Sequence, residues 1–347
     1  MIHGQVGTGP YRVLKNEPSE IILERFEKYH GGLPQIRTVS LRTSPTLRTA
    51  WTSLLRGDID MVSNVTPEAV EFISNDDIQV VSYVRHFQFV VAFSSQATQL
   101  RSPEVRRALN LAVDRDSLIR NVLHGRGLPS TGPLWPRHWA IDPAITSYRY
   151  DSSLAVSLLQ GAHLPQQSES KVPGALFRFV CLVPANFAVL ERVALEVQKQ
   201  LFNARIDMQF EVVPIEEFNN RVRDGKFEAM LMDVVSGPTF ERGYQFWRSR
   251  QHFQGFNTFG YENPESDRVI DILRQTSNEA AVRSANSRLQ QIWRDDPPAL
   301  FLAWSERTRA VSKAFTIVQE SGRDPVDPLY TIWRWTADRR MTLARAN

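Results

Sequence analysis

Cysteine is almost absent from the sequence, since Cys181 is the single one among 347 residues. One cysteine cannot form an internal disulfide, and it is too few for a cysteine-based metal centre. The histidines also lack the short spacings that metal ligands have. They are His3, His30, His86, His124, His138, His163 and His252. We therefore expect neither a metal ion nor a cofactor.

Long apolar runs and an export signal are missing as well. No stretch approaches the roughly 18 apolar residues with which a helix crosses a bilayer. The first residues, Met1–Gln5, lack the charged and apolar regions of a secretory signal peptide. The sequence as given predicts no membrane-spanning helix and contains no recognisable secretory signal peptide.

No block of one charge stands out. The chain has 41 lysines and arginines against 38 aspartates and glutamates, which gives 41 − 38 = +3, and the two signs are interspersed. Proteins that bind nucleic acids usually gather basic residues on one face. We therefore expect no nucleic-acid partner and interpret the pI near 9.1 as that of a solvated surface.

Short catalytic and nucleotide-binding motifs are absent too. The chain has no Gly-x-Ser-x-Gly elbow, no P-loop and no zinc-binding helix. The glycines of residues 4–9 precede an alternating strand pattern, which favours a turn into a hairpin over a phosphate loop. The pairs Asp58/Asp60 and Asp295/Asp296 lie at element ends, where carboxylates are usually solvated. We therefore expect that the protein is not an enzyme. A hydrolase whose catalytic triad is assembled from residues distant in the sequence is the weaker alternative.

What the sequence does contain is the composition of an ordinary globular protein. Its residues are 42% hydrophobic and 23% charged, and its length suffices for two domains.

The most informative stretch is Arg85–Gly127. An apolar run at residues 87–93 is typical of a buried strand. Ser102-Pro103 then begins a helix, because serine caps the first turn and proline fits the first helical position. Apolar residues continue at helical spacing to Leu123.

Strand and helix patterns alternate in the second half of the chain. Strands are expected at residues 177–182, 206–212, 227–232 and 299–304, and helices at 187–203, 215–224, from Asn263 and at 280–294. This alternation predicts a partly parallel sheet with helices on both faces. The first part instead predicts a hairpin (11–14 with 21–25), strands at 36–41, 58–62 and 78–83, and helices from Ser44 to Gly57 and at 67–73.

Five segments resemble one family, among them Leu54 with Gly57-Asp58-Ile59-Asp60. Residues 102–115, Ser-Pro-Glu-Val-Arg-Arg-Ala-Leu-Asn-Leu-Ala-Val-Asp-Arg, are similar to a segment of the extracellular solute-binding proteins of family 5, the peptide- and nickel-type receptors of ABC importers. The stretch that begins Gly-Thr-Gly-Pro-Tyr resembles another, with Phe26 where asparagine is usual and His30 where tryptophan is usual. The aromatic- and proline-rich residues 128–150 and the tail from Ala280 resemble two more.

The resemblance implies an α/β fold of the type II periplasmic-binding-protein kind, with two lobes joined by a hinge. Lobe I would comprise residues 1–95 and 306–347, and lobe II residues 96–305, a mixed α/β sheet with covering helices. The crossings would lie near Phe93–Leu100 and Trp304–Thr308. A sizeable part precedes the Gly-Thr-Gly-Pro-Tyr segment in the family, so we expect an incomplete lobe I with an unpaired sheet edge.

The resemblance also suggests where a ligand would bind. Closure of two lobes requires a solute that contacts the closed state better than the open state. Peptide-binding relatives carry an aspartate for the peptide ammonium near residues 230–240. Aligning Pro238 with the family's last proline puts Gly237 at that position, and Asp233 is nearby but out of register. Losing one partner of a buried charge pair costs about 2–5 kcal/mol of the roughly 8 kcal/mol in micromolar binding. A solute other than a peptide is therefore an open alternative.

The candidate ligand-binding residues are charged, aromatic and polar residues in and after this strand: Asp233, Arg242, Tyr244, Trp247, Phe256 and Asn257. Two alternatives stay open. Tyr244 and Trp247, three residues apart, could be the packed face of a short helix. Arg242 could be a solvated surface residue.

The function implied by the resemblance is the substrate-binding component of an ABC importer, a monomer that captures a small solute and catalyses no reaction. It would lie in the periplasm or cell envelope, and its protein partners would be the membrane permease subunits. Nickel-binding relatives leave a metal-containing solute open. The alternative is the ligand-sensing domain of a cytoplasmic transcriptional regulator, which predicts a DNA-binding helix-turn-helix in the N-terminal part that precedes the Gly-Thr-Gly-Pro-Tyr segment in the family.

Overall fold

A computed structural model describes residues 7–66, 69–70, 77–130, 132–145, 148–162, 164, 170, 172–235, 245–249, 257–318 and 327–338. The chain divides into two compact units. The first consists of Met1–Arg85 and Glu306–Asn347, and the second of His86–Ser305. The boundary passes through β5 (Ile78–Phe93) and β10 (Ala299–Ser312), which are hydrogen-bonded neighbours in one sheet.

Both boundary strands are longer than the sequence predicts. The expected strand at 78–83 continues through residues 84–86 and joins the apolar run at 87–93, so β5 has 16 residues. The first boundary therefore lies at Arg85/His86, earlier than the expected residue 95. The second lies at Ser305/Glu306, within the expected Trp304–Thr308 crossing.

The main sheet is mixed. Its strand order is β4-β10-β5-β9-β7-β8, and β6 also pairs with β10. The shorter strands are β4 (Met61–Val62), β6 (Gly127–Pro129), β7 (Phe177–Pro184), β8 (Ile206–Val213) and β9 (Ala229–Val235). β7 runs parallel to both β8 and β9, which confirms the partly parallel sheet expected from the alternating pattern. β5 runs antiparallel to β9.

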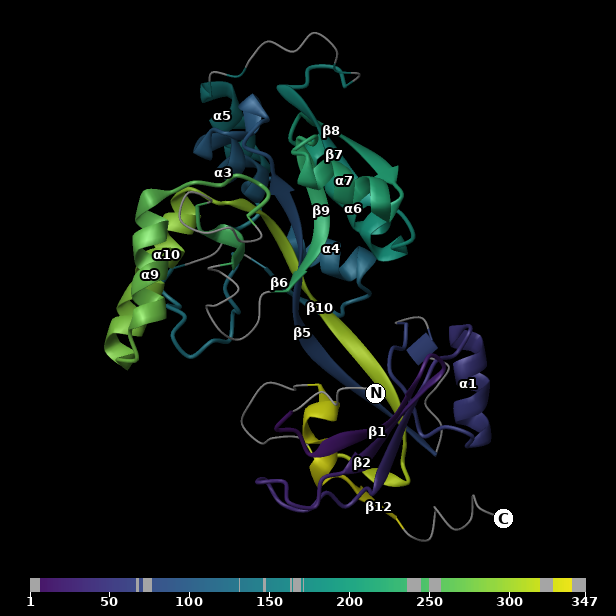
Figure 1. Ribbon diagram of the computed structural model, residues 1–347. Coiled ribbons are helices and arrows are strands. Elements are labelled where there is room, and N and C mark those ends of the chain that lie inside the picture. The colour runs from purple at the N-terminus through teal and green to yellow at the C-terminus, as the bar shows by residue number, and fades with distance from the viewer. Residues whose placement is uncertain are drawn as a thin grey trace. The chain divides into compact units, whose positions relative to one another are not determined.

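Helices cover both faces of this sheet in the second unit (Figure 1). They are η1 (Thr98–Leu100), α3 (Pro103–Leu111), α4 (Arg115–Val122), α5 (Ser152–Gly161), α6 (Ala188–Asn203), α7 (Ile215–Arg223), α9 (Pro264–Gln275) and α10 (Glu279–Asp295). Side chains of a strand alternate between its faces. Phe89 and Val91 of β5 therefore join one core with α3 to α6, while Val90 and Ala92 join the other with α9 and α10.

The helix expected from Ser102 to Leu123 is two helices. Ser102 caps α3 as predicted, with its Oγ accepting from Val105 N at 3.4 Å. The helix ends at Leu111, however, and Asp114 caps a second one by accepting from Ser117 N at 3.0 Å. A carboxylate that can cap a new first turn competes with helix continuation.

Three polar residues of segment 102–115 bind main-chain carbonyls rather than a solute. Arg106 donates to Pro297 O, Asn110 to Ala299 O, and Arg115 to Ser130 O and Phe301 O, over 2.6–3.0 Å. All three are buried. Burial lowers the pKa of Arg115 to about 10. This segment, which carries the strongest resemblance, therefore ties the helices to β10.

The first unit contains a separate antiparallel sheet of β1 (Tyr11–Glu17), β2 (Glu20–Arg25) and β3 (Thr38–Arg42), followed by α1 (Leu47–Arg56). Thr46 rather than Ser44 caps α1, and Gly57 ends it at φ 77°, the left-handed conformation predicted there. The C-terminal elements are β11 (Phe315–Thr316), η3 (Pro328–Arg334) and β12 (Thr336–Ala337). The helix expected at 67–73 lies mostly outside the described residues.

A buried ion pair fixes η3 in the first unit. Arg309 of β10 donates two hydrogen bonds to the Asp327 carboxylate, at 2.9 and 2.6 Å, and the Tyr83 hydroxyl donates a third at 3.0 Å. Burial alone would raise the pKa of Asp327, but the hydrogen bonds from Arg309 and from Leu329 N outweigh it, so the pKa is lowered.

Candidate functional site

Three parallel strands end along one edge of the second unit's sheet. β7 is parallel to β8 and β9, so Pro184, Val213 and Val235 close the three strands at the same side. We call this side the carboxyl edge. β5 enters the second unit there, because its Phe87 pairs with Val235. In open α/β sheets ligands bind outside the carboxyl ends of the strands.

Asp233 is a charged residue near this edge. It is the one charged side chain of β9, and it lies directly opposite Phe89 of β5 in the ladder. Its residue is neither buried nor fully exposed. A carboxylate here can accept hydrogen bonds from an ammonium or amide group of a solute. Of the six predicted residues, Asp233 is the one that the structure describes at the carboxyl edge.

An exposed aromatic residue at this edge was missed by the sequence interpretation. The turn after β7 is held by Ala185 N, which donates to Val213 O at 2.7 Å. Asn186 follows at φ 69°, in the left-handed region that asparagine tolerates. Phe187 then begins α6 with 48% of its side chain exposed. An apolar ring open to solvent at a strand-to-helix turn is a candidate for stacking on a solute.

Polar and aromatic groups also meet where β5, β6 and β10 converge. The Ser130 hydroxyl donates to Gln88 Oε1, and both residues are fully buried. Trp135 lies edge-on to His86 and to Trp304, with ring centroids 4.7 and 5.0 Å apart. These contacts hold the part of β5 that begins the second unit, at His86 and Gln88.

Two other predicted residues are core residues in the structure. Trp247 is 1% exposed and packs on Phe259 and Phe301, with ring centroids 5.4 and 5.5 Å away. Asn257 is also 1% exposed, and its amide donates to Arg248 O and Tyr261 O at 2.9 Å. The structure thus gives these two side chains a packing role, which for Trp247 was the stated alternative. Arg242, Tyr244 and Phe256 lie outside the described residues.

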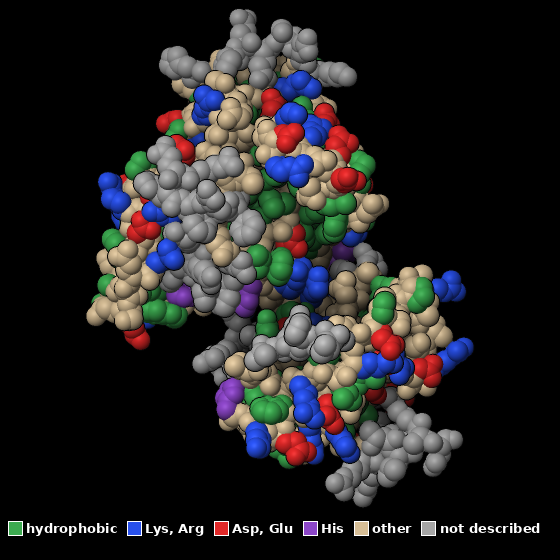
Figure 2. Space-filling view, in the orientation of Figure 1, with side chains coloured by type: hydrophobic (Ala, Val, Ile, Leu, Met, Phe, Trp, Pro, Cys, Tyr) green, Lys and Arg blue, Asp and Glu red, His purple; other side chains and the backbone are tan. Residues whose placement is uncertain are grey.

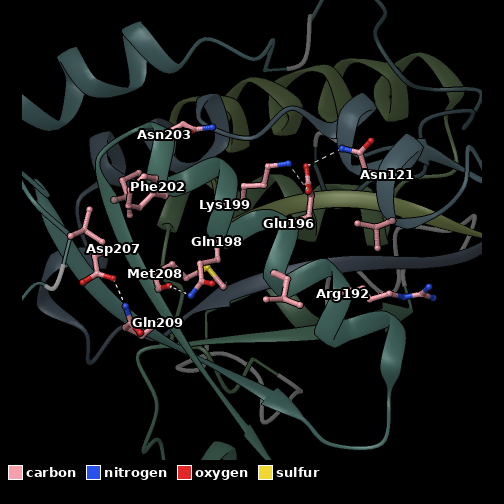
Figure 3. A pocket seen from close by; sticks show the side chains of 14 residues that line it. Asn121, Arg192, Glu196, Gln198, Lys199, Phe202, Asn203, Asp207, Met208 and Gln209 are labelled. Carbon is pink, nitrogen blue, oxygen red and sulfur yellow. Dashed lines mark hydrogen bonds and ion pairs between the residues drawn. The ribbon is translucent and has the colours of Figure 1, made fainter.

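A further hollow of the described surface lies elsewhere (Figure 3). It measures about 680 Å³ and is lined by α4, α6 and the first half of β8, away from the carboxyl edge. Its polar groups bind one another: Gln198 donates to Met208 O at 2.8 Å, and Glu196 meets Lys199 at 3.6 Å and Asn121 at 3.3 Å. Internal pairing of this kind favours a groove between helix and sheet over a solute site.

Within the described residues, four features bear on other chemistries. No group of three or more histidine, cysteine, aspartate or glutamate side chains there could hold a metal ion. None of the described helices is long and apolar enough to span a membrane. On the face shown in Figure 2, basic and acidic side chains of the described residues are intermixed. Cys181 is fully buried, and burial raises the pKa of its thiol.

Comparison with known proteins identifies the family. The model for bacterial extracellular solute-binding proteins, family 5 Middle, matches residues 3–254. The chain belongs to this family. The oligopeptide-binding protein AppA of Bacillus subtilis is 24% identical over 340 residues, which are 95% of this chain and 62% of AppA. The dipeptide-binding protein of Escherichia coli is 24% identical over 89% of this chain and 57% of its own length. The chain thus spans about 60% of the length of these relatives.

Solved structures show the same fold. AppA of Bacillus subtilis in complex with a nonapeptide matches with a TM-score of 0.72 and 23% identity, over 95% of this chain and 66% of AppA. NikZ of Campylobacter jejuni in complex with Ni(L-His) matches with a TM-score of 0.76 and 20% identity, over 95% of this chain and 68% of NikZ. The expected type II periplasmic-binding-protein fold is confirmed. The family is one of binding proteins rather than enzymes, and the regulator alternative gains no support from these relatives.

Proposed function

We propose that this chain is the solute-capturing part of the substrate-binding component of an ABC importer. It takes up a small solute between its two lobes by hinge closure and catalyses no reaction. The observation that supports this most is the family match over residues 3–254. The protein acts in the periplasm or cell envelope, as a monomer, and delivers its solute to the permease subunits.

The solute that we propose is a small amino-acid-derived molecule. The relatives are named for oligopeptides and dipeptides, and NikZ was solved with nickel bound to histidine. These ligands share amino and carboxylate groups. Asp233 supplies the polar contact at the carboxyl edge and Phe187 the apolar one. Arg242, Tyr244 and Phe256 remain predicted contacts, whereas Trp247 and Asn257 support the site from the core.

The proposal is tested by a thermal-shift screen with dipeptides, oligopeptides, glycosides and nickel–histidine, followed by calorimetric titration of the hits. A ligand present at 100 times its Kd stabilises the folded state by about 2.7 kcal/mol, which a melting curve detects. Stabilisation by one solute class without turnover supports the proposal. Chemical conversion of the solute, or no stabilisation by any class, contradicts it.

The matched variants are Asp233→Asn and Asp224→Asn. Asp224 follows the last residue of α7, which returns the chain from the carboxyl end of β8 towards the start of β9. It therefore lies near the amino ends of the parallel strands, at the sheet edge opposite to the carboxyl edge. If peptides alone stabilise the protein and only Asp233→Asn abolishes the effect, the carboxylate recognises the peptide ammonium in spite of its shifted register. If both variants bind like the wild type, Asp233 is not a ligand contact.

A further inference from the structure

Another hollow of the second unit lies between α10, β10 and the loop that follows β6. It measures about 200 Å³. Its apolar wall consists mainly of aromatic and aliphatic side chains of these three segments, namely Pro133, Leu134, Ile145, Tyr148, Trp293 and Trp304. We call this space the aromatic hollow. Neither Phe187 nor Asp233 lines it, so it is separate from the contacts proposed at the carboxyl edge.

Most polar groups at the wall of the aromatic hollow already bind protein groups. The Asp142 carboxylate accepts a hydrogen bond from Ser287 Oγ at 2.6 Å. Gln290 accepts from Asp142 N at 2.9 Å and donates to Asp142 O at 3.3 Å. The Tyr148 hydroxyl donates to Arg294 O. These bonds fix the position of the loop on α10 and leave few polar groups for a ligand.

The charges at this wall balance. Asp142 and Arg294 are the charged residues among the described ones that line the hollow, and their signs are opposite. The Tyr148 phenol adds no charge, because burial raises its pKa above the ordinary value. The wall therefore favours an uncharged ligand over an anion or a cation.

One polar group at the aromatic hollow has no partner in the described part of the chain. This group is the indole N–H of Trp293, a residue that is only 4% exposed. Buried N–H groups in proteins generally have an acceptor, and a donor left without one costs free energy. Because Trp293 lines the hollow, an acceptor atom bound there would satisfy this donor.

The volume of the aromatic hollow limits the size of its ligand. An apolar cavity of about 150 Å³ binds benzene in another protein, so about 200 Å³ has room for one ring with a small substituent. The rings of Tyr148, Trp293 and Trp304 at the wall can pack edge-on or offset against such a ring.

We propose that the aromatic hollow binds a small uncharged aromatic compound with one acceptor oxygen, and that Trp293 Nε1 donates a hydrogen bond to this oxygen. The bound ring packs between α10 and β10. The inference goes beyond the proposed function, because it does not depend on solute capture at the carboxyl edge.

Two probes of nearly equal size test this site in the full chain. Acetophenone carries a carbonyl oxygen, whereas ethylbenzene has no acceptor, and benzoate serves as the charged probe. Saturation-transfer NMR titration gives the Kd of each probe. In protein labelled with ¹⁵N at its eight tryptophans, the signal that is missing from Trp293→Phe identifies the Trp293 indole N–H.

We expect acetophenone to bind saturably and to shift the Trp293 indole signal. Ethylbenzene, which cannot accept the hydrogen bond, and benzoate, which is charged, should bind about tenfold more weakly. No saturable binding of acetophenone, equal affinity for acetophenone and ethylbenzene, or tighter binding of benzoate would overturn the proposal.

Three variants locate the site. Trp293→Phe keeps a ring and removes the donor, so acetophenone should bind about tenfold more weakly than to the wild type. Trp139→Phe is the matched control and should bind like the wild type, since Trp139 is 48% exposed and does not line the hollow. Ile145→Trp fills the hollow from its other wall and should abolish binding of both uncharged probes, which tests the site even if Trp293→Phe does not fold. Wild-type affinity in Ile145→Trp, or equal losses in the two tryptophan variants, would contradict the proposal.

Discussion

Arg115 of α4 donates a hydrogen bond from Nε to the main-chain carbonyl of Phe301 in β10, at 2.8 Å. The same Nε lies 2.6 Å from the carbonyl of Ser130, at the end of β6. One buried guanidinium thus joins a helix to two strands of the sheet.

Replacement of Arg115 by methionine should lower the free energy of unfolding by about 3 kcal/mol, because buried carbonyls lose their donors. Urea denaturation measures the loss. Arg120→Met, at an exposed position in the same helix, should change stability by no more than about 0.5 kcal/mol. Equal losses from the two variants would show that the Arg115 contacts do not hold the fold.

Trp247→Ala should destabilise the protein by about 3–5 kcal/mol, because it leaves a cavity between Phe259 and Phe301. Thermal or urea unfolding measures this effect. If the variant instead has wild-type stability and weakened solute binding, Trp247 contacts the solute, as the sequence interpretation proposed.

Phe187→Ala should weaken solute binding while it changes stability by less than about 0.5 kcal/mol, because the ring is half exposed at the carboxyl edge. Phe202→Ala is the matched control, since Phe202 is 53% exposed at the other end of α6. Calorimetric titration with the solute found in the screen should separate the two. Wild-type affinity in both variants would remove Phe187 from the proposed site.

Cys181 should resist thiol reagents in the native protein. Its side chain is inaccessible, and burial raises the pKa of the thiol, so little reactive thiolate forms near pH 8. Reaction with a chromogenic disulfide should become rapid only in denaturant, whereas the exposed variant Phe202→Cys should react at once in the native state. Fast native labelling of the wild type would contradict the buried position of β7.

The Asp327 carboxylate should make the first unit acid-sensitive. Its pKa in the folded state is lowered below the unfolded value of about 3.9. The unfolded state therefore binds more protons in this range, so the stabilisation is present above that value and is lost as pH falls through the folded pKa. Asp327→Asn should flatten the stability curve between about pH 2 and 4. Asp58→Asn, exposed in the same unit, should leave the curve as in the wild type.

Local patterns were sufficient to predict much of the second unit. The stripe of Leu190, Val193, Val197 and Leu201 predicts α6 almost to its ends. The lengths of β5 and β10 were not predictable in this way, because half-buried polar residues interrupt the apolar pattern: Arg85 and His86 in β5, and Glu306 and Arg307 in β10. The break between α3 and α4 was missed because the apolar spacing continues past Asp114. Only the structure shows that the Asp114 carboxylate caps a new helix by accepting a hydrogen bond from Ser117 N.

The candidate site was less accessible to sequence reasoning. Asp233 was predicted from the resemblance of residues 230–240 to the peptide-binding relatives, and the structure places it near the carboxyl end of β9. Trp247 and Asn257 have the residue types of a binding site, but only the packing shows that both lie in the core. Phe187 was missed because a phenylalanine beginning a helix resembles a core residue until its exposure is known.

The stretch by which the family is recognised holds main-chain carbonyls in place, through Arg106, Asn110 and Arg115. Side chains used in this way stabilise the scaffold and do not contact a solute. Similarity within this stretch therefore indicates the fold and does not indicate which solute is bound.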